Sequence, residues 1–146
     1  MFEFSIQMSK NLKLLPKTFV RKSFKKTNKT NVLCCGYYGI KSCQSSKLTL
    51  KNVNFLKKFL EKQFSFVLQK KKIKIWNKIV TSLTTTKISS ESRMGKGKGS
   101  VVGEFSFIRP GQIIFEVEKI PLSLMKKVFI KICKQLSFKV KLIVNA

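Results

Sequence analysis

The chain has 146 residues, of which 31 are Lys or Arg and only 6 are Asp or Glu, so its formal net charge is +25. This length suggests one domain, or one domain with a tail, and a hydrophobic content of 43% argues against wholesale disorder. The charge calls for an anionic partner, which by itself leaves nucleic acid, an acidic protein and an anionic membrane open. No run reaches the roughly 18 apolar residues that a membrane span needs.

The N-terminal segment is strongly basic. Residues 9–30 carry eight positive charges and no acid, and their apolar residues are sparse and aperiodic. This composition predicts an extended or irregular arm that becomes ordered on its partner, with a solvated disordered tail as the alternative. Phe19, Val20 and Phe24 lie among the cations and favour an arm that docks. We therefore expect an arm over residues 1–30 and a single folded domain over 31–146.

The first half of this domain predicts a strand, a helix and a second strand. Residues 32–41 are β-branched, aromatic and apolar, which is typical of a strand bent at its glycines. Thr49 can cap a helix over residues 50–69, where apolar residues recur at three- and four-residue spacing. We interpret that apolar face as core rather than as a partner groove. Alternation of lysine with apolar residues from Lys72 to Asn77 predicts a half-buried strand with a cationic face.

The second half predicts a loop, a hairpin, a helix and a final strand. Residues 81–92 are rich in Ser and Thr, as in a loop or an irregular strand. Two alternating segments flank Pro110 and Gly111, a turn pair that predicts a β-hairpin. Pro121 opens a helix whose apolar stripe extends to Leu136, and "SFKVKLIV" closes the chain as a strand. The order of elements predicts an α+β domain with a mostly antiparallel sheet and two helices.

The segment "SRMGKGKGS" contains three of the seven glycines of the chain, alternating with Lys96 and Lys98. Glycines let the backbone approach phosphates closely and form a concave nest of N–H groups. The lysines add charge, and Arg93 can fork onto a phosphate or stack on a base. The spacing fits neither a P-loop nor a dinucleotide motif. These residues alone leave two readings in balance, a finger that follows a polyanion and a solvated mobile loop.

Side chains for catalysis are scarce, because the chain has no His and its acids are scattered glutamates. Glu104, Glu116 and Glu118 fall on the predicted hairpin and can approach one another, but in so basic a chain we expect them to pair with lysines. The four cysteines lack a C-x-x-C spacing, and we interpret them as reduced, half-buried thiols rather than a metal site or a disulfide. We expect no enzyme activity, no cofactor and no metal.

The segment "RMGKGKG", followed ten residues later by "RPGQIIFEV", resembles the signature of the large-subunit ribosomal protein sixteen family. The resemblance covers residues 15–144. Within it, "LPKTFVRKSFKK" resembles the basic arm of the family, "CGYYGIKS" its glycine-aromatic strand and "IPLSLMKKVFIKICKQLSFKVKLIV" its last helix and strand. The resemblance implies a hammerhead-type α+β fold and a structural, non-enzymatic role in the large ribosomal subunit.

The resemblance further implies binding to large-subunit rRNA, contact with neighbouring large-subunit proteins, and a loop directed toward tRNA near the peptidyl-transferase region. Carried over, the tRNA-facing candidates are Arg93, Met94, Gly95, Lys96, Gly97, Lys98 and Gly99, and the rRNA-binding candidates are Arg21, Lys22, Lys25, Lys26, Lys41, Lys70, Lys71 and Lys72. The family resemblance thus supplies the identity of the polyanion, which the loop residues alone leave open.

The main alternative is an organellar DNA-binding or architectural protein, which explains the charge but not the ordered succession of motifs. A membrane-active protein is less favoured, because the lysines spread over the whole chain instead of lining one amphipathic helix. We expect no membrane association and no homo-oligomer. The bias toward Lys, Phe, Ile and Asn, with Ala only at Ala146, fits an AT-rich organellar genome. We expect a mitochondrial ribosome, with a plastid as second choice.

Overall fold

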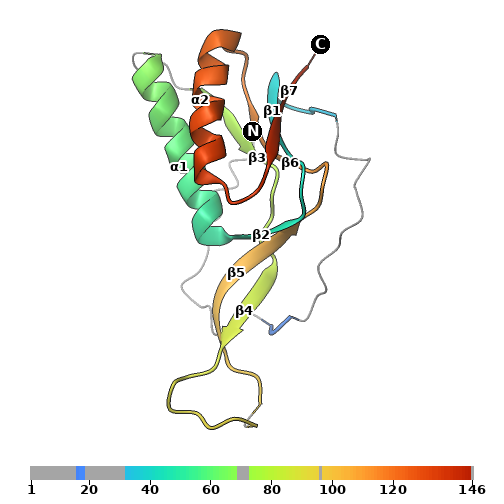
Figure 1. Ribbon diagram of the computed structural model, residues 1–146, viewed down its shortest axis with the longest axis vertical. Helices are drawn as coiled ribbons and strands as arrows, with labels where there is room; N and C mark the ends of the chain where they lie inside the picture. The colour runs from blue at the N-terminus through green and yellow to red at the C-terminus, as the bar shows by residue number, and fades with distance from the viewer. Residues whose placement is uncertain (1–15, 19–31, 69–72, 96, 146) are drawn as a thin grey trace, which may run out of the picture.

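The computed structural model describes residues 16–18, 32–68, 73–95 and 97–145. The elements in these residues are β1 (Tyr38–Ser42), β2 (Ser46–Thr49), α1 (Leu50–Val67), β3 (Ile75–Asn77), β4 (Leu83–Lys87), β5 (Ser100–Ile108), β6 (Ile113–Val117), α2 (Leu122–Gln135) and β7 (Val140–Val144). The strands form two antiparallel sheets, one in the order β3-β6-β1-β7 and the other in the order β2-β5-β4 (Figure 1). The predicted α+β class, with antiparallel pairing and two helices, is confirmed.

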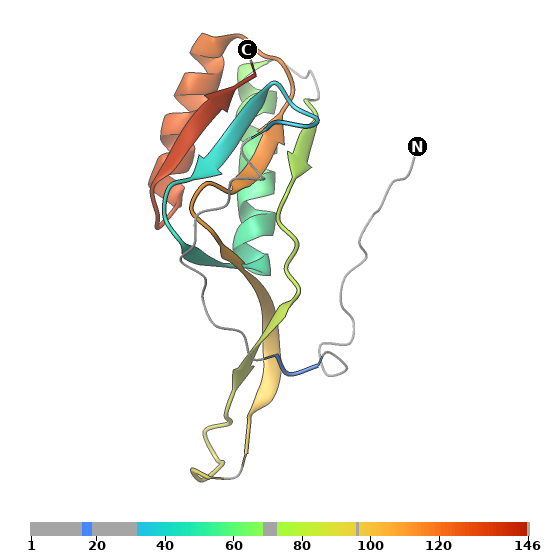
Figure 2. The ribbon, with the colours of Figure 1, turned by 90° about the vertical axis from the view of Figure 1, so that its right-hand side faces the viewer.

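The body of the protein consists of the four-stranded sheet with both helices on one of its faces (Figure 2). β6 lies inside this sheet, and all five of its residues are buried. Phe64 of α1 and Met125 and Ile132 of α2 belong to the same buried cluster as Ile114 and Phe115 of β6. The apolar stripes of both helices therefore bury against the sheet, as their periodicity predicts.

Helix α1 begins where the sequence predicts. The Thr49 side chain accepts a hydrogen bond from the Asn52 N–H at 3.3 Å and so satisfies one of the free donors of the first turn. The helix ends at Val67, two residues before the predicted end, and Gln69 lies outside the described residues. Helix α2 begins at Leu122, with Pro121 as the residue that precedes its first turn.

The predicted hairpin around Pro110 and Gly111 is wrong. The turn itself is present, since the Gln112 N–H donates to the Arg109 carbonyl at 3.1 Å and Gly111 has a φ of 88°. However, β5 pairs with β2 and β4, whereas β6 pairs with β1 and β3. The reason is burial: four of the five residues of β6 are apolar and all five are buried, so β6 takes a central place under the helices, while β5 becomes exposed toward its first residues. The turn thus passes the chain from one sheet to the other.

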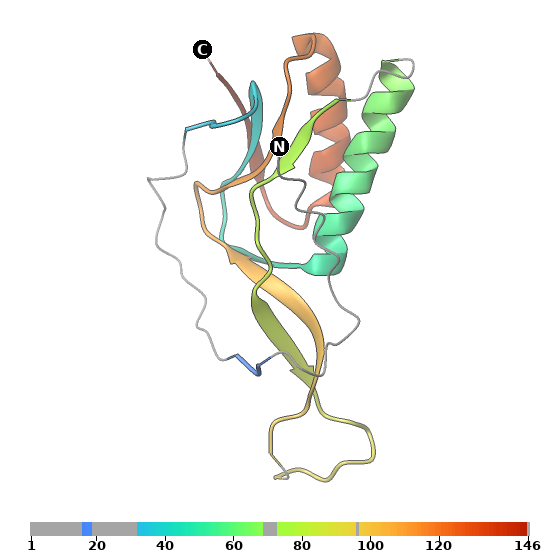
Figure 3. The same cartoon turned by 180° about the vertical axis from the view of Figure 1, so that it is seen from behind.

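The hairpin that does form joins β4 and β5, and it projects from the body with residues 88–95 and 97–99 at its far end (Figure 3). The segment 81–92, predicted as a loop or irregular strand, contributes β4 and then the start of this loop. β2 was not predicted, because Leu48 is its only buried residue and four residues show no clear period. The first strand is shorter than predicted, since residues 32–37 precede β1.

Candidate nucleic-acid interface

The loop at the end of the β4–β5 hairpin depends on its glycines in two ways. Gly95 and Gly97 have φ values of 89° and 87°, in the left-handed region that other residues rarely adopt. Gly99 has an ordinary φ, but a Cβ there would collide with the Lys87 carbonyl across the neck of the hairpin. The loop therefore turns at Gly95 and Gly97, and its two ends approach closely at Gly99.

The tip of the loop is exposed, as a binding finger requires. Met94 is 99% exposed, Arg93 is also exposed, and nothing lies within 4 Å of the position where Gly95 or Gly97 would carry a Cβ. A shallow hollow beside the tip is lined by Ile88, Ser89, Ser92, Arg93, Gly97, Lys98, Gly99 and Ser100. The structure thus brings together six of the seven predicted loop residues, while Lys96 lies outside the described residues.

Lys98 has a different environment from the one the sequence suggests. Its ammonium group donates to the Thr18 carbonyl at 2.9 Å, and in return the Lys17 ammonium group donates to the Lys98 carbonyl at 2.8 Å. The side chain is therefore directed at residues 16–18, which run beside the hairpin, and it is not a free cation at the loop tip (Figure 3).

Thr84 of β4 also binds this segment. Its backbone N–H donates to Thr18 Oγ1 at 2.9 Å, and its own Oγ1 accepts from the Thr18 N–H at 3.0 Å. Thr84 Oγ1 also donates to the Pro16 carbonyl at 2.8 Å. We call this set of contacts, made by residues 16–18 with Thr84 and Lys98, the clasp. Sequence reasoning missed Thr84, because one threonine in a Ser/Thr-rich run carries no distinguishing signal.

Of the predicted rRNA-binding residues, the structure describes Lys41 alone. Arg21, Lys22, Lys25, Lys26, Lys70, Lys71 and Lys72 lie outside the described residues. Lys41 lies on β1 directly opposite Lys141 of β7. Because the neighbouring Ile40 is fully buried under the helices, alternation places both lysines on the opposite face of the sheet. Two like charges side by side repel each other, so this position is suited to an anion.

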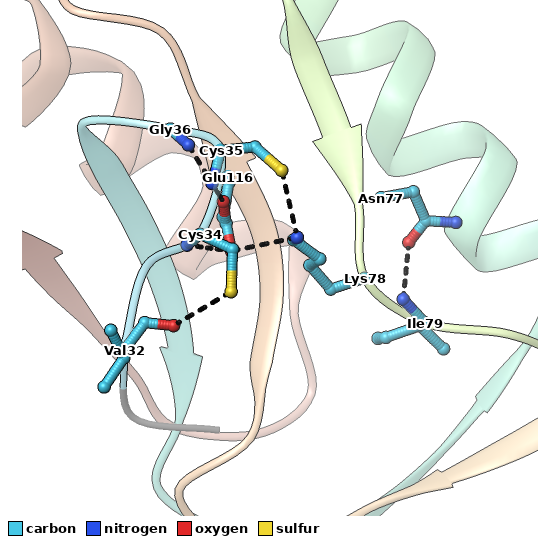
Figure 4. A network of polar contacts seen from close by, with 8 residues as sticks. All are labelled: Val32, Cys34, Cys35, Gly36, Asn77, Lys78, Ile79 and Glu116. Carbon is cyan, nitrogen blue, oxygen red and sulfur yellow. Dashed lines mark hydrogen bonds and ion pairs between the residues drawn. The ribbon is translucent and has the colours of Figure 1, made fainter. Parts of the chain in front are cut away.

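Glu116 is the centre of a polar network inside the body (Figure 4). Its carboxylate accepts hydrogen bonds from the N–H groups of Cys35 at 2.7 Å, Gly36 at 2.9 Å and Cys34 at 3.4 Å, and it lies 3.4 Å from the Lys78 ammonium group. Burial alone would raise the pKa of Glu116, but these donors outweigh it, so the pKa is lowered below its ordinary value. The network ties the segment before β1 to β6.

The expectation that the glutamates pair with lysines holds for Glu116 but not for Glu104. Glu104 is buried in the second sheet, where Thr81 donates to one carboxylate oxygen at 3.4 Å and the other oxygen has no partner among the described residues. Glu104 and Glu116 lie on strands of different sheets. Glu118 accepts from the Lys74 backbone N–H at 3.2 Å.

The four cysteines are free thiols, but only Cys43 is half-buried as predicted. Cys34, Cys35 and Cys133 are exposed. The Lys78 ammonium group, besides its contact with Glu116, lies 3.4 Å from Cys35 Sγ. Burial would lower the pKa of Lys78, but these contacts outweigh it and the pKa is raised.

Among the described residues, neither helix combines the length and the apolar content needed to cross a membrane.

The fold and the site define a class: a cationic α+β protein with an exposed, glycine-rich loop at the end of a two-stranded hairpin. A protein-family model described as "Ribosomal protein L16p/L10e" matches residues 11–143. The chain belongs to this family of ribosomal proteins, and its role is structural and not enzymatic. The family predicted from the loop signature and the motif order is confirmed.

The chain is also similar to named members of this family. It is 36% identical over 131 residues to "Large ribosomal subunit protein uL16m" of Chondrus crispus, covering 87% of this chain and 93% of that protein. It is 33% identical over 91 residues to the protein of the same name from Marchantia polymorpha, covering 62% and 64%. The uL16c protein of Phaeodactylum tricornutum is 28% identical over 115 residues, covering 79% and 80%. The two mitochondrial-type names and the plastid-type name match the predicted order of organelles.

Proposed function

We propose that this protein is a constituent of the large subunit of a mitochondrial ribosome, where it binds large-subunit rRNA and presents the loop of the β4–β5 hairpin toward tRNA near the peptidyl-transferase region. The observation that carries the proposal is the exposed glycine-turned loop at the end of a projecting hairpin, in a chain of the L16p/L10e family. β5 has nine residues and is about 30 Å long, and its residues 100–105 pair with β4 to form the projecting hairpin.

The loop residues divide into groups with different proposed roles. Arg93 and Met94 contact the tRNA directly, because both are exposed at the tip. Gly95 and Gly97 supply the backbone conformation and accessible N–H groups for a phosphate. Lys96 supplies a positive charge between them. The Lys98 side chain is engaged with residues 16–18, so its role is to orient the loop rather than to contact tRNA.

The remaining basic residues are proposed to bind rRNA. The arm over residues 1–30, with Arg21, Lys22, Lys25 and Lys26, and the lysines 70–72 follow phosphates of the large-subunit rRNA, and residues 31–146 form the RNA-binding domain. Lys41 supports this role, since it lies opposite Lys141 on the sheet face away from the helices and a phosphate there would relieve their repulsion. Neighbouring large-subunit proteins complete the set of partners.

Sedimentation tests the ribosomal part of the proposal. The tagged full chain, expressed in the organelle, is expected to co-sediment with large subunits in a sucrose gradient and to leave them only as salt rises. Phosphate contacts weaken with salt, by roughly a factor of ten or more over a few-fold increase for several contacts. Free sedimentation, or sedimentation with organellar DNA, would overturn the ribosomal proposal, and the latter would favour the architectural alternative.

A substitution in the loop tests the tRNA part. Lys96→Ala is expected to enter large subunits normally and to weaken aminoacyl-tRNA binding to the assembled ribosome several-fold. Lys87→Ala, at an exposed lysine on the last residue of β4, is the matched control and should leave tRNA binding unchanged. Failure of Lys96→Ala to enter subunits would show that the loop is an assembly element, and the tRNA role would then be wrong.

A further inference from the structure

Helix α1 carries a second apolar face in addition to the one buried in the core. Phe55 is 54% exposed and Phe66 is 83% exposed, although α1 already buries Leu56, Leu60 and Phe64 against the sheet. At 3.6 residues per turn, Phe55, Phe59 and Phe66 fall within about 40° of one another around the helix axis. We call these three side chains the aromatic row.

The aromatic row is partly ordered by contacts between its own rings. The rings of Phe55 and Phe59 are stacked, with centroids 6.1 Å apart and an interplanar angle of 25°. Phe59 also packs against the core cluster, so it anchors the row to the body. Three phenylalanines on one side of a helix, two of them more than half exposed, favour a surface that another molecule covers, because single exposed apolar residues are common but several on one side of a helix are not.

Cations lie along one side of the aromatic row. Lys51, Lys58 and Lys62 are exposed and fall beside the rings at helical spacing. The one acid of α1, Glu61, lies 4.0 Å from Lys57, and within the described part of the chain no ion pair engages the other three lysines. On the opposite side, the Lys131 ammonium group of α2 donates to Gln63 Oε1 at 2.7 Å and joins the two helices.

We propose that the aromatic row is a stacking platform for unpaired RNA nucleotides, whose phosphates bind Lys51, Lys58 and Lys62. The inference rests on the proposed rRNA binding and deepens it, since it assigns a surface and the kind of RNA structure that the surface takes. Unpaired nucleotides are required because the bases of a duplex cover each other and leave no face for a phenyl ring. Proteins that bind single-stranded nucleic acids combine exposed aromatic rings, on which bases stack, with cations that bind the phosphates.

A protein partner fits this surface less well. The centres of protein interfaces are rich in aromatic residues but depleted in lysine, because an ammonium group is costly to remove from water. Here three lysines fall beside the rings at helical spacing and form no ion pair within the described residues. A phosphate backbone supplies the neutralising charge at the same repeat as the bases that stack.

The first experiment measures binding of the purified full chain to a fluorescein-labelled single-stranded RNA and to the matched duplex. Phe55→Ala with Phe66→Ala is expected to weaken single-strand binding about tenfold or more, since one base–aromatic stack accounts for roughly this factor, and to change duplex binding less than twofold. Ile130→Ala removes an equally exposed apolar side chain, 58% exposed on α2, and should change neither affinity.

A conservative series at one position separates stacking from plain apolar contact. Phe55→Tyr keeps an aromatic ring and is expected to retain single-strand binding, whereas Phe55→Leu is expected to lose it as Phe55→Ala does. Because Phe55 is exposed, all these variants should melt at the temperature of the unchanged chain. Equal binding of the double variant and the unchanged chain, or full retention by Phe55→Leu, would overturn the stacking platform.

The second experiment identifies the occupant in ribosomes. A photo-crosslinking phenylalanine analogue at position 66 is expected to crosslink to unpaired rRNA nucleotides in assembled large subunits. A crosslink to a ribosomal protein instead would overturn the proposal and assign this face to protein docking. If the chain does not enter large subunits at all, the sedimentation experiment contradicts the proposed ribosomal function. The comparison of single-stranded with duplex RNA still decides whether the stacking platform exists.

Discussion

The body and the hairpin of this protein are held together by different forces. In the body, Phe64, Ile114 and Met125 are each no more than 2% exposed, and burial of such side chains dominates stability. In the hairpin, β4 has Thr84 as its only buried residue, and hydrogen bonds from a segment about 66 residues earlier in the chain hold it. Stability is therefore concentrated in the body, while the placement of the proposed functional loop depends on polar contacts.

The largest effect is expected from a cavity in the body. Phe64→Ala should lower the free energy of unfolding by about 3–5 kcal/mol, because it removes a fully buried ring from the cluster between α1, α2 and the sheet. Met94→Ala, at the 99% exposed tip of the hairpin loop, should change it by less than about 0.5 kcal/mol. Urea unfolding of both variants measures the contrast, and equal losses would show that the two regions do not differ as described.

A smaller effect is expected from the polar network of the body. Glu116→Gln should cost about 2 kcal/mol, because the amide has one accepting oxygen and its NH2 group must face at least one of the three N–H donors, and because Lys78, which is 29% exposed, loses its counter-charge. Because folding lowers the pKa of Glu116, the stability it contributes is fully present above the ordinary carboxyl pKa of 4.5 and is lost as pH falls through the lowered value. The free energy of unfolding of the unchanged chain should therefore exceed that of Glu116→Gln by a constant amount from pH 5 to neutrality, and the difference should shrink in acid. An advantage that stays unchanged below pH 4 would contradict the assigned network.

The clasp gives a third and smaller effect. Thr84→Val keeps the shape of the side chain but removes the hydroxyl that bonds to Thr18 and Pro16, so it should cost about 1 kcal/mol and release residues 16–18. Tryptic cleavage after Lys17, followed by mass spectrometry, should become several-fold faster.

Two variants control for general loosening of the hairpin. Thr85→Val removes a hydroxyl that bonds to the Gly103 carbonyl within the β4–β5 pair, and it should leave cleavage after Lys17 unchanged. Thr84→Ser should restore the slow rate. If Thr84→Val and Thr85→Val were cleaved alike, the clasp would have no separate contribution.

The smallest change in stability is expected at the loop tip. Gly97→Ala places a Cβ at a φ of 87°, which strains the backbone by up to about 1 kcal/mol, but the Cβ meets no neighbouring atom, so the melting temperature should fall only modestly. Gly99→Ala should lower it more, because the new methyl group must displace the Lys87 carbonyl at the neck. A thermal scan of the two variants side by side tests this order, and a larger loss at Gly97 would show that backbone strain at the tip outweighs the collision at the neck.

Local patterns in the sequence predict much of this architecture. Thr49 and the apolar spacing after it predict α1 to within two residues, and the alternation before the C-terminus predicts β7. The glycine–lysine alternation predicts an exposed loop that needs positive φ. These features are predictable because caps, helical periods and glycine conformations depend on residues near one another in the chain.

Other features follow no local rule. The turn at Pro110 and Gly111 is predicted correctly, but the pairing of the two strands that flank it is not. A turn signal does not indicate which sheet each flanking strand joins. Thr84 and Lys98 bind residues 16–18, and the buried Glu116 collects N–H groups from residues 34–36, across more than 60 positions of sequence in each case. No spacing within a short window encodes such contacts.

The sequence by itself determined the α+β class, the family signature, the charge that requires a polyanion and the exposed loop, because each depends on composition or on neighbouring residues. Only the tertiary structure decided that β5 and β6 separate into two sheets, that Lys98 is turned back onto the N-terminal segment and that α1 keeps a row of phenylalanines outside the core. Those outcomes depend on which surfaces compete for burial, and this competition is settled only when the whole chain packs.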